Sequence, residues 1–325
     1  MPGPKTHDIF YKDLKKKLSD ETLASFPNYD DYNVFAQGHD FLIYHDFYKI
    51  WNQERLNQNV QNSVLLQEHS FSEFIYHYLN TAMESGAIED EQTRLFIGPG
   101  YIMHHLLDAY THPQIIYYSG DHVRDPKNRT WKHGIVENLI DIYLMEEKEG
   151  KNPRMYPVYK DFEFLCDTSE ALIQTLDSSL FDIYHIQNGG EIFQKSFYQM
   201  ESFMKLMKYD PSGFKQKIFD LFDPVLKGTS SFSYHRDSKE VFPYLNLEDE
   251  EWQNPVNGEV SRESFLELYD RALCDGSYII DELEKMCQRG TIYKDDIYSL
   301  IPNISSVHGL ECEIPMKIKY KKNEQ

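Results

Sequence analysis

Cysteine is scarce in this chain, and no two cysteines stand at the spacing of a redox or metal motif. The four are Cys166, Cys274, Cys287 and Cys312, in a chain of 325 residues. This spacing excludes the dense disulfide framework of a small secreted domain. It predicts free thiols in a reducing compartment.

Long apolar runs are also missing. No stretch of 18 apolar residues predicts a transmembrane helix. The first residues, MPGPKTHDIF, have neither an apolar h-region nor a small-residue cleavage site, so we see no signal peptide. From these two features we expect a cytoplasmic protein without a transmembrane segment.

Positive charge is in short supply. The chain has 33 Lys and Arg against 53 Asp and Glu, a formal net charge of −20. Such a surface repels phosphate backbones, which argues against tight binding to long nucleic acid. A small phosphate-bearing substrate stays possible, because bound divalent cations would dominate the local field.

Strand-like alternation is rare, whereas apolar residues recur with helical period along most of the chain. We therefore predict an all-α protein. Its length suits one large domain. Residues 1–150 would form a metal-binding helical core, 151–316 would complete the same domain and wall its cleft, and 317–325 would be a flexible tail. The predicted helices cover 8–19, 62–84, 92–111, 131–146, 161–185, 191–207, 213–226, 262–288 and 293–301.

Histidine is concentrated in the first half, where ten of the 13 lie before residue 135. The segment GYIMHHLLDAYTHP, residues 100–113, places His104, Asp108 and His112 at i, i+4 and i+8, on one helical face. Zinc accepts both imidazole and carboxylate ligands, and the central carboxylate could bridge two ions. His105 points about 100° away and is expected to be structural. Pro113 should end or kink the helix.

A second pair lies on the next predicted helix. In WKHGIVENLID, His133 and Glu137 stand at i and i+4. Alone the pair is weak evidence, since such pairs often just hydrogen-bond on a surface. Together with His112 it forms a three-ligand set that leaves a position for water, as in catalytic zinc sites.

Three other segments carry metal-type residues whose roles the residues alone leave open. Asp40 follows the glycine turn of FAQGHDFLIYHDF, where a ligand, a general base or a helix cap is possible. His69 in LLQEHSFSEF and His7 in KTHDIF are unconvincing as isolated residues.

Taken in order, these segments resemble the ligand-bearing stretches of the bacterial zinc-dependent phospholipase C family. The similar parts are the THDIF start, the GHD turn, the GYIMHHLLDAYTHP helix and the HGIVE helix, within residues 5–145. A looser likeness extends through 251–272. The resemblance implies the all-helical fold of the phospholipase C and single-strand nuclease superfamily, and zinc-dependent hydrolysis of phosphodiesters.

The resemblance also implies a ligand set, carried over residue by residue. One zinc ion would be held by His69, His104, Asp40 and Asp108. A second would be held by His112, His133 and Glu137. His7 and a bridging Asp108 would contribute to a third. We therefore expect two firmly bound zinc ions, with a third present only at high metal or with a phosphate ligand.

The chain departs from the family pattern at three points. Secreted relatives begin with a tryptophan whose amino group and carbonyl complete the third site, and no Trp precedes His7 here. His39 stands where the family often has proline. His77 is a rival for the role of His69.

The expected activity is hydrolysis of a small phosphodiester or a phospholipid headgroup. Paired cations would neutralise phosphate charge and activate a bound water, with Asp40 as general base. One alternative is an HD-type phosphohydrolase, suggested by the dipeptides His7-Asp8, His39-Asp40 and His45-Asp46. Another is a non-catalytic helical protein with a structural metal site, although such sites usually include cysteine.

Overall fold

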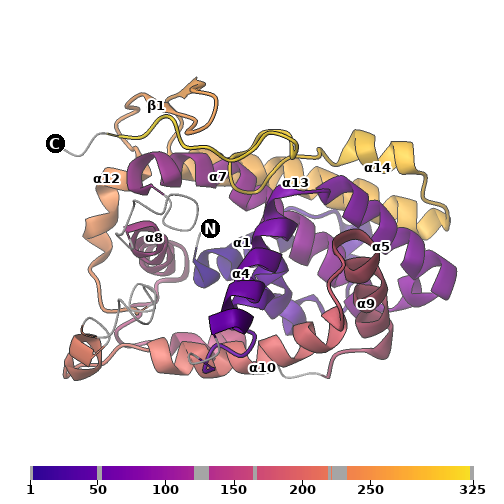
Figure 1. The fold of residues 1–325 in the computed structure, drawn as a ribbon, viewed down its shortest axis with the longest axis horizontal. Helices are drawn as coiled ribbons and strands as arrows, with labels where there is room; N and C mark the ends of the chain where they lie inside the picture. Colours follow the sequence, from indigo (N-terminus) through magenta and orange to yellow (C-terminus); the bar gives the residue numbers. More distant parts are fainter. Residues whose placement is uncertain are drawn as a thin grey trace.

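The chain folds almost entirely into helices, as predicted (Figure 1). This computed structural model describes residues 3–49, 53–120, 132–163, 167–218, 221 and 233–322, and the side chains of 53–57 are not described. Half of the predicted helix 213–226, the residue Cys166 and the last three residues lie outside these ranges. Within them, Cys274, Cys287 and Cys312 are free thiols.

The helices begin and end as follows: α1 (Pro4–Lys15), α2 (Asp20–Ala24), η1 (Tyr29–Asp40), α3 (Phe41–Tyr44), α4 (Gln53–Glu68), α5 (Phe71–Ser85), η2 (Ala87–Glu89), α6 (Glu91–Leu95), η3 (Phe96–Ile102), α7 (Met103–Ser119), α8 (Lys132–Glu149), η4 (Val158–Phe162), α9 (Glu170–Tyr184), α10 (Gly189–Met207), η6 (Ser238–Val241), α12 (Phe242–Leu245), α13 (Phe265–Arg289) and α14 (Lys294–Leu300). The described strands, β1 (Trp252–Gln253) and β2 (Val260–Ser261), form one short antiparallel hairpin.

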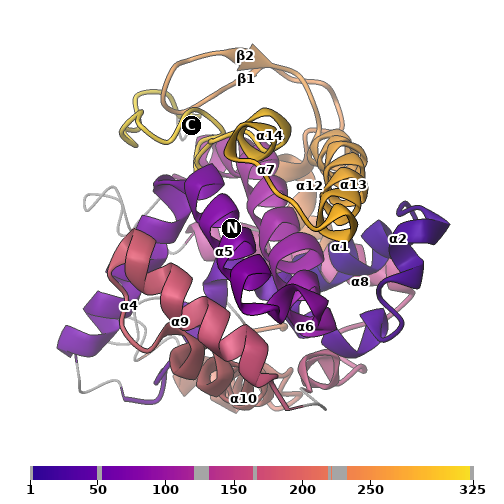
Figure 2. The ribbon, with the colours of Figure 1, turned by 90° about the vertical axis from the view of Figure 1, so that its right-hand side faces the viewer.

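Helix α7 occupies the middle of the arrangement. It packs against α13, α8, η1, η3 and the β1 strand, and α8 in turn packs against α1. Figure 1 shows α7 and α13 side by side, with the C-terminal segment running along them. In Figure 2, α9 and α10 lie on the opposite side of the molecule from α13 and α14. One large apolar core draws members from both halves of the chain.

Two predicted helices are interrupted where the backbone leaves helical geometry. The segment 62–84 splits into α4 and α5 because Ser70 has a positive φ of 52°. The segment 92–111 is broken by a π-helical turn, η3, that contains Pro99 and leads directly into α7. Such π-turns are frequent at functional sites.

Of the two effects expected of Pro113, an end or a kink, the helix end does not occur, since α7 continues to Ser119. A proline inside a helix cannot donate a hydrogen bond to the carbonyl four residues earlier, here that of Ala109. Gly309 of the C-terminal segment packs against this carbonyl, where an added Cβ would come within 2.5 Å of the oxygen. Tertiary packing therefore covers the gap that the proline leaves.

The described part of the C-terminal tail, predicted to be flexible, forms backbone hydrogen bonds with other elements. The backbone amides of Lys319 and Tyr320 donate to the carbonyl of Pro255, and that of Lys322 donates to Tyr117 on α7. These bonds attach residues 317–322 to the β-hairpin region and to α7.

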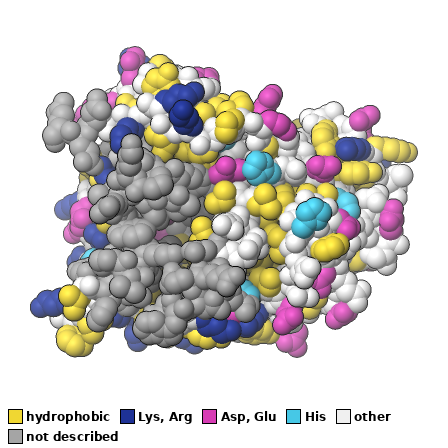
Figure 3. Space-filling view, in the orientation of Figure 1, with side chains coloured by type: hydrophobic (Ala, Val, Ile, Leu, Met, Phe, Trp, Pro, Cys, Tyr) yellow, Lys and Arg dark blue, Asp and Glu magenta, His cyan; other side chains and the backbone are white. Residues whose placement is uncertain are grey.

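No helix among the described residues is both long and apolar enough to span a bilayer. On the part of the surface coloured in Figure 3, acidic, apolar and a few basic side chains are intermingled, in line with the excess of Asp and Glu.

Candidate metal centre

The stripe predicted on α7 faces the protein interior. His104, Asp108 and His112 are 1%, 0% and 3% exposed. Burying ionisable groups is costly unless each is paired or holds a metal. Their partners on other elements therefore decide what this stripe does.

His7 on α1 meets the first part of the stripe. Its Nε2 lies 3.2 Å from one oxygen of Asp108, while Nε2 of His104 lies 3.3 Å from the other oxygen. The two imidazole rings stack with centroids 3.8 Å apart. Asp108 thus lies between the two histidines, with one oxygen toward each.

Asp40 reaches the same end of α7 from the glycine turn. Its Oδ2 lies 3.8 Å from Nε2 of His104, and its Oδ1 lies 3.3 Å from Nδ1 of His39. Gly38 makes this approach possible, because an added Cβ would lie 2.6 Å from Cβ of His104. Asp40 does not cap α3 with its side chain.

The other end of the stripe joins α8. Nε2 of His112 lies 3.8 Å from Oε1 of Glu137, and Nε2 of His133 lies 2.7 Å from the same oxygen. All three residues are buried. This is the three-ligand set expected from the spacing on the two helices.

Three of these histidines have their rings held by backbone carbonyls. A histidine whose Nδ1–H donates a hydrogen bond presents the lone pair of Nε2 to a metal, and this is the usual arrangement of ligating histidines. The Nδ1···O distances are 2.9 Å for His104 to Ala36, 2.8 Å for His112 to Ser306 and 3.1 Å for His133 to Gly120. In each case Nε2 is the atom that faces the carboxylate.

The electrostatics differ from group to group. Burial opposes the charged form of His104, but the nearby Asp108 and Asp40 outweigh it and raise the pKa of His104 above its ordinary 6.5. Burial, with the nearby His104, lowers the pKa of His7 to about 4, which keeps this imidazole neutral near pH 7. Burial opposes ionisation of Asp108, but the charges of His104 and His7 outweigh it and hold its pKa well below the usual range. Burial raises the pKa of Asp40 to about 7.

Two features of these groups fit bound metal ions. Ligand atoms at about 2.0–2.2 Å from a tetrahedral ion stand about 3.4 Å apart, close to the 3.2–3.8 Å separations of His7, His104, Asp108 and Asp40. In addition, several buried atoms form no well-directed hydrogen bond in the described structure: both ring nitrogens of His7, both carboxylate oxygens of Asp108, and Nε2 of His104 and His112. Nε2 of His7 and of His104 meet Asp108 only in the ion-pair contacts given above. Buried polar atoms are rarely left so. Only His133 and Glu137 stand closer than coordination requires.

His69 does not join the site, so its predicted role as a ligand is not supported by its position. It is exposed at the end of α4, where its carbonyl accepts a hydrogen bond from Tyr184. Its rival His77 pairs with Asp182 near the surface. In their place the structure brings His39, whose buried ring lies across His104 with centroids 4.5 Å apart. Asp40 was predicted as a zinc ligand from the same turn, whereas His39 was named among the candidate ligands only through the HD alternative.

His105 has the structural position expected of it. Its Nε2 lies 2.6 Å from the carbonyl oxygen of Ile304, and its ring stacks on Phe71 with centroids 3.5 Å apart. Burial lowers its pKa to about 3. It belongs to none of the metal-type groups among the described residues.

A fourth carboxylate cluster, Asp8, Glu149 and Asp161, is organised around a lysine. The buried ammonium of Lys5 pairs with Asp8, and it lies 2.9 Å from Glu149 and 2.6 Å from Asp161. Lys12 adds a second positive charge, 2.6 Å from Asp8. These cations already neutralise the carboxylates, so we assign the cluster to stability.

In two of the three dipeptides of the HD alternative, the carboxylate is engaged by lysines in the same way: Asp8, as described above, and Asp46. The third dipeptide, His39-Asp40, forms a metal-type group with His104. Asp46 pairs with Lys49 at 3.0 Å and with Lys195 at 3.1 Å, and it stands 3.9 Å from His45. The described residues thus give this alternative no metal-type group at His45-Asp46. They do bring His133 and Glu137 together with His112.

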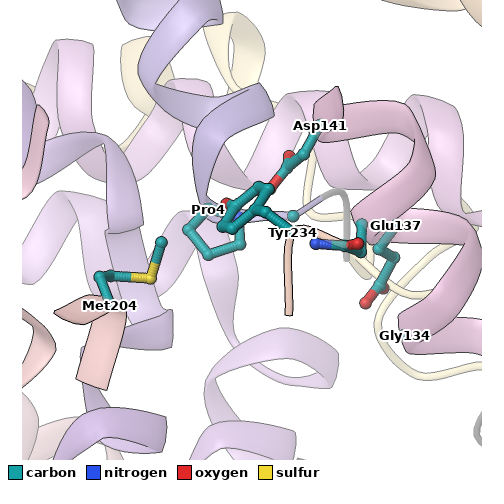
Figure 4. Close-up of a pocket in the computed structure, with 8 residues that line it drawn as sticks. Pro4, Gly134, Glu137, Asp141, Met204 and Tyr234 are labelled. Carbon is teal, nitrogen blue, oxygen red and sulfur yellow. The ribbon is translucent and has the colours of Figure 1, made fainter. Parts of the chain in front are cut away.

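A pocket adjoins the second group. Figure 4 shows Pro4, Tyr234 and Glu137 around this space, with Met204 on the far side from Glu137. Its wall includes Asp141, which stands one turn beyond Glu137 on α8. Asp141 accepts hydrogen bonds from the amide of Thr6 at 2.7 Å and from the Tyr234 hydroxyl at 2.9 Å. It thereby ties the start of α1, and with it His7, to the helix that carries Glu137.

Comparison with known proteins leaves the family open: no family model, no curated protein and no solved structure matches this chain. The resemblance to zinc-dependent phospholipase C therefore stays a prediction from the sequence.

Proposed function

We propose that this protein is a metal-dependent phosphodiesterase with a fold of the zinc-dependent phospholipase C type. One observation carries the proposal: eight buried histidine and carboxylate side chains from α1, η1, α7 and α8 gather into three groups with ligand-type spacing. Zinc suits this mixture of imidazole and carboxylate, although iron and manganese accept it too.

The residues divide the work of such a site. Bound divalent ions would neutralise the phosphate and supply an activated water. Asp108, between His7 and His104, is placed to share its two oxygens between neighbouring ions. Asp40 presents one oxygen toward His104 and the other toward His39, so it is our candidate both for a ligand and for the base that takes a proton from water.

The group of His112, His133 and Glu137 is more typical of a catalytic metal site than of a structural one. Three protein ligands leave a coordination position for water or substrate, whereas structural zinc sites are closed by four ligands and usually include cysteine. No cysteine takes part in the metal-type groups of the described residues.

The substrate is expected to be small. The formal charge of −20 disfavours a long polyanion. A small phosphodiester or the headgroup of a phospholipid needs to be neutralised only at the site itself, where the cations would do it.

Metal analysis followed by hydrolysis assays tests the proposal. The purified protein should bind at least two zinc ions. It should also hydrolyse a member of a panel that includes an activated aryl phosphodiester, nucleotide diesters and phospholipid in mixed micelles. Glu137→Gln should lower the rate at least 100-fold, while the exposed His69→Ala should leave it unchanged. A metal-loaded protein that is inert toward the whole panel would favour the non-catalytic alternative.

A further inference from the structure

The strongest feature outside the predicted zinc-ligand set is the place of His39. Its ring is fully buried, and it meets Asp40 and His104 with ligand atoms within 4.8 Å of one another. Two of these three residues are ligands in the proposal above. The remaining question is whether His39 only supports them or completes their metal site.

The orientation of the His39 ring answers this question. Its Nε2 lies 3.4 Å from Oγ of Ser306, which is itself 3.4 Å from the carbonyl oxygen of Gln67. Its Nδ1 points the other way, toward Asp40 at 3.3 Å. This arrangement is the reverse of His104, His112 and His133, where Nδ1 meets a carbonyl and Nε2 faces the site.

The same rule of orientation applies to both arrangements. A ligating imidazole donates its second N–H to a neighbouring oxygen, which fixes the tautomer and leaves the other nitrogen for the metal. In His39 the oxygen on the Nε2 side belongs to Ser306, so Nδ1 is the atom directed at the Asp40–His104 group.

The backbone of the turn is built for this approach. Gly38 has φ 47° and ψ −126°, a conformation that other residues rarely adopt. Its missing Cβ lets the turn pass against His104, so that residues 39 and 40 both face the end of α7. The chain therefore accepts an unusual backbone in order to bring this dipeptide to the site.

We infer that His39 is a ligand, through Nδ1, of the metal ion held by Asp40 and His104, in the place that the family resemblance assigns to His69. This inference rests on the metal site of the proposed function, but it does not depend on which reaction the site performs.

Ser306 acts through His39 as a positioning residue. Its hydroxyl faces His39, while its carbonyl accepts the hydrogen bond of His112. One residue of the C-terminal segment thus orients a histidine at each end of the α7 stripe. Ser306→Ala removes only the hydroxyl, so it should weaken the His39 site about 10–100-fold and leave the His112 site intact.

Zinc titration of matched variants tests the assignment. His39→Ala should lose one zinc equivalent or bind it at least 100-fold more weakly, and His69→Ala should titrate like the wild type. His39→Asn should retain more affinity than His39→Gln, because the asparagine oxygen reaches the position of Nδ1 and the glutamine oxygen that of Nε2. Circular dichroism checks that each variant is folded.

The wild type supplies a second readout that does not require a folded variant. In long-range proton–nitrogen NMR spectra of labelled histidine, zinc should shift Nδ1 of His39, but Nε2 of His104 and His112. Full zinc binding by His39→Ala, loss of zinc in His69→Ala, or a zinc-induced shift at Nε2 of His39 would each overturn the inference. Because all these measurements detect metal, an inactive but zinc-binding protein would refute the proposed function without affecting this result.

Discussion

Replacing Gly38 with alanine tests the geometry on which the first metal group depends. The substitution adds one methyl group, and two costs follow from the structure. The backbone at φ 47° and ψ −126° becomes strained, at about 1–3 kcal/mol. The new Cβ also lies 2.6 Å from both Cβ and Cγ of His104, an overlap worth about 1–3 kcal/mol.

The sum is a loss of about 2–6 kcal/mol from a free energy of unfolding that is typically about 5–15 kcal/mol. The clash is with the base of the His104 side chain, which cannot swing away without moving its Nε2. We therefore expect Gly38→Ala to weaken zinc binding at His104 and to spare the site of His112, His133 and Glu137.

Gly86 provides a matched control. It also has a positive φ, 78°, but an added Cβ would meet nothing within 4 Å. Gly86→Ala should therefore cost only the left-handed backbone penalty of about 1–2 kcal/mol and keep all its zinc. Urea unfolding and metal analysis of the two variants measure both effects. Equal stability and equal zinc content in the two would show that the approach of the turn to His104 is not what holds the site together.

Three further predictions follow. His112→Ala should lose one zinc ion while its helical circular dichroism stays unchanged, since alanine is a good helix former; undiminished zinc content would contradict the assignment. Lys5→Met should lower the free energy of unfolding by about 3–5 kcal/mol, because it strands buried carboxylates. Burial opposes the charged forms of Asp161 and Glu149, but Lys5 outweighs it and holds their pKa values below the ordinary 3.8 and 4.5. The wild type should therefore lose stability as pH falls below about 4. Urea unfolding across pH should show a smaller loss of stability in Lys5→Met. Asp141→Asn should lower the free energy of unfolding by about 1–3 kcal/mol, because it weakens the attachment of α1 to α8. A tenfold lower zinc affinity would show that the change also displaces His7. Unchanged stability would argue that Asp141 does not hold α1 in place.

Helical periodicity predicted most of the secondary structure because each helix buries one face of its own residues. The predictions were wrong where the decisive interaction is not local. Nothing in the sequence around Ser70 shows that its backbone turns left-handed and separates α4 from α5. Pro113 was expected to end or kink α7. The helix does not end there, and Gly309, almost 200 residues later, covers the carbonyl that the proline frees.

In the candidate site, too, local helix geometry accounts for only part of the arrangement. His104, Asp108 and His112 lie on one face because a helix brings i, i+4 and i+8 together, and His133 and Glu137 follow the same rule on α8. His69 was named as a ligand because the family resemblance implied it, with His77 as its rival. In the fold His69 is exposed, whereas His39 is enclosed.

By itself, the sequence determined which helices carry the metal-type residues and which of their faces those residues share, since both follow from the regular geometry of the α-helix. Only the tertiary structure decided that α1, η1, α7 and α8 direct these faces at one another, and that Ala36, Gly120 and Ser306 hold the imidazole rings. The reason is physical: those holding groups are backbone carbonyls, which every residue possesses, so no residue type marks them in advance and only the path of the chain places them.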